Sequence, residues 1–328
     1  MANVQAKHPD RSAQSRLLAP LAYVTAIGMF IVLVMGATVT NTGSETGCGR
    51  SWPLCQGRLI PEFAMRTLIE FSHRFVVGIE TILILALAVG AWRTFPRNGA
   101  LKVLVGLMVG FLFLQAGMGA WAVMAPQASA VLALHFGISL VSVASTALVA
   151  AFIAEGEQGQ ALLHRGVSSA FTRAVWGTLV FTIVDVYVGA YIRHTGLNMG
   201  CRGWPLCNGA VIPVLNGPAG IVFAHRLGAL ALTAALVALL VWSWQLRHDR
   251  PDLLRGSIAS LILVGVQALT GAMVAETGMN LWSALLHAGT TGILFTSLCY
   301  VGYHALPFPV AQPEAATPEV VKHQVSTA

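Results

Sequence analysis

Apolar residues along the chain gather into eight long segments that are separated by shorter polar stretches. These segments cover residues 18–40, 63–92, 101–124, 128–153, 171–193, 217–245, 255–275 and 280–303. Each is near or above the ~20 residues that an α-helix needs to cross a bilayer. The first segment is too long for a cleavable signal peptide, and no small-residue cleavage site follows it. The pattern therefore predicts an all-α, polytopic membrane protein with eight transmembrane helices.

The composition excludes several classes of protein. Hydrophobic residues make up 56% of the 328 residues and charged residues only 10%, with a mean hydropathy of +0.72. Soluble proteins carry roughly 25% charged residues, so these values exclude a soluble enzyme and a disordered chain. The net charge of +6 fits basic cytoplasmic loops, and no stripe of Lys and Arg suggests binding to nucleic acid. The expected surroundings are a lipid bilayer.

The loops between the apolar segments differ in their content of basic residues. Loops and tails on one side hold twelve Lys and Arg, whereas those on the other side hold five. Because basic residues are enriched on the cytoplasmic side, we expect both termini in the cytoplasm and a multi-pass protein of the plasma membrane. The polar residues 306–328, rich in Pro, Glu and Ala, are expected to form a disordered tail.

The two halves of the chain repeat each other. Gly36-Ala37 recurs as Gly189-Ala190 at an offset of 153 residues. After the loss of one residue the offset is 152, and it holds for Trp-Pro-Leu-Cys at 52–55 and 204–207. The same offset relates His73-Arg74 to His225-Arg226, Gln115 to Gln267, Gly119 to Gly271 and His135 to His287. So many matches in one register indicate a duplication.

The duplication predicts the architecture. Each repeat holds four spans, an even number, so both repeats insert with the same orientation. We expect two tandem four-helix bundles related by a pseudo-two-fold axis along the membrane normal. The expected divisions are a cytoplasmic tail (1–17), the first repeat (18–153), a cytoplasmic linker (154–170), the second repeat (171–305) and a C-terminal tail (306–328).

Four of the ten histidines lie inside predicted spans, near the outer membrane face: His73, His135, His225 and His287. They fall on spans 2, 4, 6 and 8, so the two histidines of each repeat sit at similar depth. Two imidazoles facing each other in an apolar bundle suit axial ligation of a haem iron. Hydrogen bonding between helices is the alternative, but ionisable groups in membranes are usually functional. Zinc is disfavoured because two histidines leave it short of ligands.

Other residues near these histidines suggest further roles. Arg74 and Arg226 each follow a histidine and could bind a haem propionate, or could extend to the lipid headgroups. Cysteine pairs in the two outer loops could form disulfides on an oxidising side, with metal binding as the competing interpretation. The pairs are Cys48 with Cys55 and Cys201 with Cys207. The second pair is expected to be structural, whereas a redox role for the first stays open.

The acidic residues differ between the repeats. Glu70 lies three residues before His73 on the same helix face, and its counterpart is Val222. This carboxylate suits proton transfer at one site only, although an ion pair with Arg66 or Arg74 would also explain it. Two further intramembrane acids, Glu80 and Asp185, have apolar counterparts and no assigned partner.

Together these residues resemble the haem A synthase family. Similarity covers nearly all of residues 18–305, and its motifs are the segments 70–74 (Glu-Phe-Ser-His-Arg), 135–137 (His-Phe-Gly), 224–226 (Ala-His-Arg) and 287–289 (His-Ala-Gly). The resemblance implies a bacterial membrane enzyme that oxidises the C8 methyl of haem O to the formyl of haem A, for haem–copper oxidases. It implies haem b as the cofactor and, as partners, haem O synthase and oxidase assembly factors.

The resemblance also divides the sites between the two repeats. It implies haem b on His225 and His287, and the substrate haem on His73 and His135 with Glu70 as the catalytic residue. A dihaem cytochrome b that only transfers electrons is the alternative, but transmembrane electron transfer favours haems at two depths. A transporter would leave the histidine pairs unexplained.

Overall fold

The computed structural model describes residues 11–62, 64–125 and 128–307, except for the side chains of 11–17 and 157–160. Within these residues the chain forms eight α-helices, all long and apolar enough to cross a membrane. They are α1 (Arg11–Asn41), α2 (Met65–Thr94), α3 (Gly99–Met124), α4 (Ser129–Leu163), α5 (Ser169–Thr195), α6 (Pro218–Gln245), α7 (Pro251–Glu276) and α8 (Leu281–His304), with a short 3₁₀ helix, η1 (Leu197–Gly200), after α5. The predicted all-α membrane fold with eight spans is confirmed.

Local sequence signals explain several helix ends. The side chains of Asn98, Ser168 and Asn280 accept backbone N–H groups at the starts of α3, α5 and α8. Proline begins α6 and α7, where its missing N–H leaves no hydrogen bond unmade. Gly196 ends α5 in the left-handed conformation that glycine adopts most easily.

Two helices extend well beyond the apolar segments from which they were predicted. Helix α1 begins at Arg11, inside the expected N-terminal tail, and α4 continues to Leu163 through much of the expected linker. Within α4 the backbone breaks at Gly156, which has a φ of 58° and a ψ of −148°. Hydropathy marks the part of a helix that lies in lipid, so it does not locate an end formed by polar residues. The expected C-terminal tail lies outside the described residues from 308 onward.

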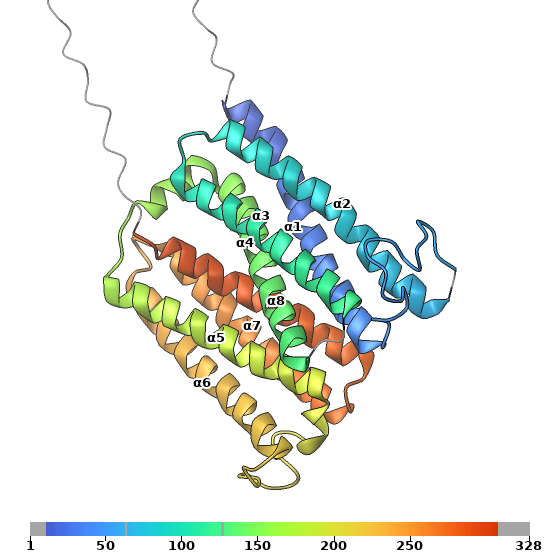
Figure 1. Cartoon of the computed structure of the whole chain (residues 1–328). Helices are drawn as coiled ribbons and strands as arrows, with labels where there is room; N and C mark the ends of the chain where they lie inside the picture. The colour runs from blue at the N-terminus through green and yellow to red at the C-terminus, as the bar shows by residue number, and fades with distance from the viewer. Residues whose placement is uncertain (1–10, 63, 126–127, 308–328) are drawn as a thin grey trace, which may run out of the picture.

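Helices α4 and α8 lie at the centre of the molecule (Figure 1). In the most apolar 18 residues of α4, 67% of the residues are buried, compared with 17% in the corresponding stretch of α7. Helix α4 contacts α8 and α5, and α1 also contacts α8, so these four helices join the two halves of the chain. Of the remaining helices, α2 packs against α1 and α3 packs against α4, whereas α6 packs against α5 and α7 packs against α8.

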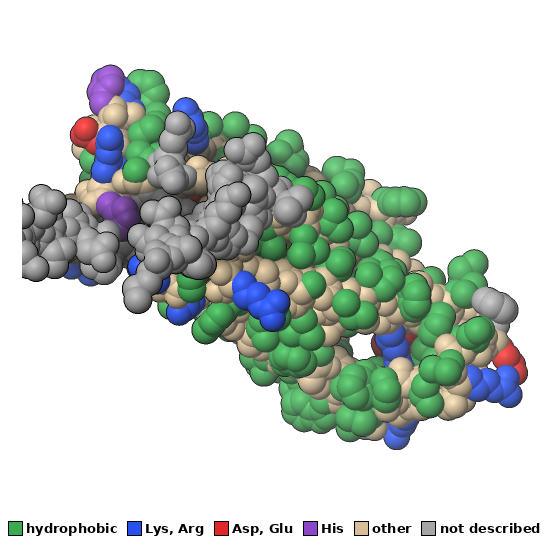
Figure 2. Space-filling view, turned by 90° about the horizontal axis from the view of Figure 1, so that it is seen from above, with side chains coloured by type: hydrophobic (Ala, Val, Ile, Leu, Met, Phe, Trp, Pro, Cys, Tyr) green, Lys and Arg blue, Asp and Glu red, His purple; other side chains and the backbone are tan. Residues whose placement is uncertain are grey.

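The outer surface has the polarity of a membrane protein. Large hydrophobic side chains such as Ile82, Leu230 and Ile262 are exposed on the outside of the helices. Figure 2 shows hydrophobic side chains over most of the visible face, with charged side chains gathered mainly towards its two ends. The loops after α1 and α5 lie at one end of the bundle, whereas the start of α1 and the end of α8 lie at the other (Figure 1).

Candidate functional site

The four intramembrane histidines form two pairs. His73 on α2 lies within electrostatic range of His135 on α4, and His225 on α6 lies within the same range of His287 on α8. All four side chains are half-buried. The structure thus brings together, within each half of the chain, the two histidines that the repeat register paired.

Each histidine ring packs against a glycine of a neighbouring helix. A Cβ atom built on Gly36 or Gly119 would lie 3.4 Å and 3.6 Å from Cε1 of His73 and His135. The corresponding distances in the second half are 2.9 Å between Gly189 and His225 and 3.2 Å between Gly271 and His287. These four glycines occupy matching repeat positions on α1, α3, α5 and α7. The four glycines therefore leave room for the imidazole rings to pack closely against the neighbouring helices.

The ring nitrogens of the two pairs differ in their partners. Among the described residues, Nδ1 of His73 and Nδ1 of His135 are buried without a hydrogen-bond partner. In the second half, Nδ1 of His225 lies 3.1 Å from Oδ1 of Asp185. Nδ1 of His287 lies 3.1 Å from Thr270 Oγ1, and Gln267 Nε2 lies 3.1 Å from Nδ1 and 3.2 Å from Nε2 of the same ring. Within the part of the chain that the structure describes, polar side chains thus contact the rings of the second pair and not the Nδ1 atoms of the first.

This arrangement fits a haem in each half. Each half offers two half-buried imidazoles inside an apolar bundle, where ionisable groups are costly and usually functional. Two histidines are an axial ligand set for haem iron. In the described part of the chain, no three His, Cys, Asp or Glu side chains gather as a cluster that could hold a metal ion by itself.

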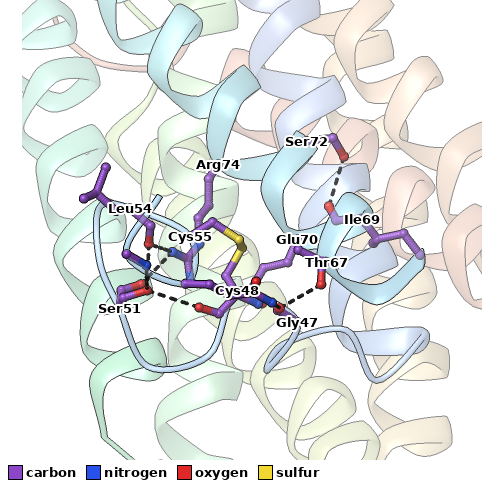
Figure 3. Close-up of a disulfide and its surroundings, with 12 residues drawn as sticks. Gly47, Cys48, Ser51, Leu54, Cys55, Thr67, Ile69, Glu70, Ser72 and Arg74 are labelled. Atoms are coloured by element: carbon purple, nitrogen blue, oxygen red, sulfur yellow. Dashed lines mark hydrogen bonds and ion pairs between the residues drawn. A yellow bond between two sulfur atoms is a disulfide. The ribbon is translucent and has the colours of Figure 1, made fainter. Parts of the chain in front are cut away.

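Glu70 lies one helical turn before His73 on α2 and binds the outer loop. Its side chain extends from α2 toward Cys48, while Arg74 reaches past the disulfide into the loop (Figure 3). The Cys48 N–H donates to Oε2 of Glu70 at 2.8 Å, and Arg74 donates to Oε1. The Glu70 carboxylate is only 3% exposed. The ion pair with Arg74 that the sequence left open is thus formed, whereas no hydrogen bond or ion pair joins Glu70 to Arg66 in the structure described.

The second half replaces this polar contact by an apolar one. Val222, the counterpart of Glu70, is buried in a small cluster with Ile192 and the two cysteines of the second loop. Both loops share other interactions at matching positions. Gln56 donates to the carbonyl of Gly47 in the first loop, and Asn208 donates to that of Gly200 in the second. The carboxylate is therefore a specific addition to a common loop structure.

The two arginines bind the outer loops rather than projecting from them. Arg74 donates to the carbonyls of Ser51 at 2.8 Å and Leu54 at 3.0 Å. Arg226 donates to the carbonyls of Gly203 at 2.8 Å and Leu206 at 3.1 Å. Their guanidinium groups hold the loops against α2 and α6, a role that the sequence did not predict.

Both outer-loop cysteine pairs form disulfides, Cys48–Cys55 and Cys201–Cys207. The disulfide prediction is confirmed. Because both cysteines of each pair are bonded, neither loop offers the thiolates that a metal site would need. The remaining cysteine of the described chain, Cys299 in α8, is a free thiol.

Several polar residues near the sites were missed or left unexplained by the sequence. Asp185 has a partner, His225, and Gln267 and Thr270 contact the other histidine of that half. The repeat register had marked Gln267, but only as a match to Gln115. Glu80 is 2% exposed, and its Oε1 has no hydrogen-bond partner among the described residues.

The fold and these sites define an eight-helix membrane protein with one intramembrane histidine pair in each half. A profile of the COX15-CtaA family, described as cytochrome oxidase assembly protein, matches residues 19–299. A protein named Heme A synthase from Symbiobacterium thermophilum is 40% identical over 283 residues, covering 85% of this chain and 92% of that protein. The Heme A synthases of Halalkalibacterium halodurans and Bacillus licheniformis are 40% and 37% identical over 280 and 289 residues. These matches cover 85% and 87% of this chain and 93% and 95% of the relatives. The chain belongs to the haem A synthase family.

Proposed function

We propose that the protein converts haem O to haem A by oxidising the C8 methyl group to a formyl group, for use in haem–copper oxidases. With water as the oxygen donor, this oxidation replaces two C–H bonds by one C=O bond and releases four protons and four electrons, and the electrons must pass to an external acceptor. The observation that carries the proposal is the presence of two histidine pairs with unlike surroundings in a member of this family. A haem held only for electron transfer needs no acid such as Glu70 beside it, whereas a site that must accept protons does.

The two halves would bind different haems. The second half would hold haem b through His225 and His287, since Asp185, Gln267 and Thr270 fix these rings. Bound haem b supplies a one-electron iron centre there. The first half would hold haem O through His73 and His135, whose Nδ1 atoms have no partner in the described chain. Rings without such anchors suit a substrate that must enter and a product that must leave.

Glu70 would be the catalytic acid–base residue of the first half. It lies one helical turn before His73, and the Cys48 N–H and the Arg74 guanidinium hold its carboxylate. From that position it could accept a proton released during oxidation of the methyl group. Arg74 and Arg226 remain candidates for binding the propionates, but each would have to exchange a loop carbonyl for a propionate oxygen.

The position in the cell follows from the charge distribution. We propose that both termini are cytoplasmic and that the disulfide loops face the oxidising outer side of a bacterial plasma membrane. The domain divisions and the pseudo-two-fold axis remain part of this proposal. Haem O synthase and oxidase assembly factors are the proposed partners for supply and delivery.

Identification of the bound haems tests the proposed activity. The protein would be purified from cells that make haem O, and its haems extracted with acid and identified by mass spectrometry. We expect haem b together with haem O or haem A. Haem b alone in both halves would contradict the proposal and support the dihaem cytochrome.

Alanine variants test the assignment of the second half. His225→Ala or His287→Ala should remove six-coordinate haem b and lower thermal stability, because bound haem stabilises the folded state and its loss leaves a cavity. The absorption spectrum of the purified variants is the measurement. Full retention of six-coordinate haem b in both would refute the assignment.

A further inference from the structure

Asp185 is an intramembrane acid on α5 that points at a histidine of the next helix. Its Oδ1 atom lies 3.1 Å from Nδ1 of His225, and its side chain is 12% exposed. Acidic residues inside membranes are rare and usually functional. This contact links two helices through residues that lie 40 positions apart in the chain.

The contact determines which nitrogen of His225 is available. A carboxylate only accepts hydrogen bonds, so Nδ1 carries the proton and donates it to Asp185. Nε2 is then the unprotonated nitrogen and can bind iron. Metal-binding histidines commonly donate their other N–H to a carboxylate, which fixes the ring and raises the basicity of the ligand.

A glycine on α6 makes room for this carboxylate. A Cβ atom built on Gly228 would lie only 2.7 Å from Cγ of Asp185. The first half has neither feature, because Val32 and Val76 stand at the matching positions and Nδ1 of His73 has no partner in the described structure. In the described structure, an acid that contacts the histidine ring and a glycine that makes room for it thus occur together in the second half only.

We propose that Asp185 is a positioning residue for haem b, which holds the His225 ring with Nε2 toward the iron and lowers the reduction potential of that haem. The inference rests on the proposed haem b assignment of the second half. A hydrogen bond to a carboxylate makes the imidazole a stronger electron donor, which favours ferric over ferrous iron. The same bond retains haem b in this half, whereas the first half releases its haem.

Redox titration of haem b in the full-length purified protein tests this. Asp185→Asn keeps an acceptor but removes the charge, and Asp185→Val copies the first half. Both should shift the potential in the positive direction, with the larger shift for valine. A tenfold change in the ratio of ferric to ferrous affinity corresponds to about 59 mV. Transfer of haem b to apomyoglobin should become faster by about 10- to 100-fold, the usual effect of losing such a partner.

A second variant disturbs the contact without changing the acid. Gly228→Ala forces the Asp185 carboxylate away from its position, so it should shift the potential in the same direction as Asp185→Asn. Gly28→Ala is the matched control, because a Cβ there would meet the Glu80 carboxylate of the first half, 2.9 Å from Cδ. The control should leave the haem b potential unchanged.

The outcomes separate this inference from the proposed function. If Asp185→Asn and Gly228→Ala both keep the parent potential and the parent rate of haem loss, Asp185 does not act on haem b. If haem b survives in His225→Ala with an unchanged spectrum, the assignment of the site has failed instead. A shift with Gly28→Ala equal to that with Gly228→Ala would also overturn the inference.

Discussion

At the scale of single residues, Glu70 has two contacts that any catalytic role must accommodate. Its two oxygens accept from the Cys48 N–H and from Arg74, so the carboxylate holds an outer loop as well as lying near His73. The second half shows that the loop can be held without it, because Val222 packs against the disulfide instead. A structural and a catalytic role can therefore be separated by substitution.

Two substitutions of Glu70 distinguish a catalytic role from a structural one. Glu70→Gln keeps the size and an acceptor for Cys48 but removes the charge, and Glu70→Val copies the second half. If the carboxylate transfers protons, both variants should lose about 10²–10⁴-fold in haem A formed per haem b bound, while haem b content stays at the parent level. Equal ratios in variant and parent would falsify the catalytic role and leave Glu70 as a support of the loop.

At the scale of helices, a buried ionic network ties three helix ends together, at the end of the bundle away from the disulfide loops. Arg250 is 2% exposed and contacts Asp252 at 2.7 Å, together with the carbonyls of Arg165 and His304. His304 in turn lies 2.8 Å from Asp252 and 3.4 Å from Glu155. The network joins α4, α7 and α8. The first repeat has the apolar pair Phe95 and Phe152 in this region.

Removal of one member of this network should lower stability without affecting the haem sites. Arg250→Ala removes one of the two partners of the buried Asp252 carboxylate and leaves only His304, and breaking such a pair typically costs about 3–5 kcal/mol. We expect a clearly lower midpoint of thermal unfolding in detergent and an unchanged haem b spectrum. Arg247→Ala is the control, since Arg247 is exposed and lies over the ring of Trp244. An equal loss in both variants would contradict a specific role of the network.

The outer loops give a second prediction at this scale. The disulfide Cys201–Cys207 spans six positions in the sequence, and a loop this short gains only about 2–3 kcal/mol from the crosslink by the chain-entropy model. Replacement of both cysteines by serine should therefore lower the unfolding midpoint modestly and leave turnover per folded molecule unchanged. Mass mapping without reduction would verify the bond in the parent. Abolished turnover in a folded, haem-loaded variant would show that the disulfide does more than hold the loop.

At the scale of the whole molecule, close packing between the halves depends on small residues. A Cβ atom built on Gly292 of α8 would lie 2.7 Å from Cδ2 of Leu33 on α1. Such contacts let the helices of the two repeats approach closely, as small residues do in membrane proteins.

Gly292→Val should therefore strain the interface between the halves. Overpacking of a well-packed core costs about 1–3 kcal/mol, so the unfolding midpoint should fall. Gly110→Val in α3 makes the same chemical change where a Cβ atom would meet nothing within 4 Å, so it serves as the control. If both variants unfold at the parent temperature, the contact between α1 and α8 contributes little to stability.

Much of this organisation could be predicted from the sequence, for a physical reason. Hydropathy and repeat register are properties of the chain itself, so eight spans and the matched histidines such as His73 and His225 are visible without coordinates. The partner of Asp185 could not be predicted, because it depends on the rotation of α5 and α6 about their axes. The helix ends at Arg11 and Leu163 could not be predicted either, since polar residues continue a helix without a hydropathy signal.

The contacts between the halves have a consequence for the history of the chain. Helix α4 meets its own counterpart α8, and the contact of α1 with α8 is matched by that of α5 with α4. Such reciprocal contacts are those of a symmetric dimer. A half-length ancestor could thus have assembled as a homodimer of four-helix subunits. Every substitution in that ancestor would have appeared in both subunits, so Glu70 and Asp185 could become specific to one half only after the gene was duplicated.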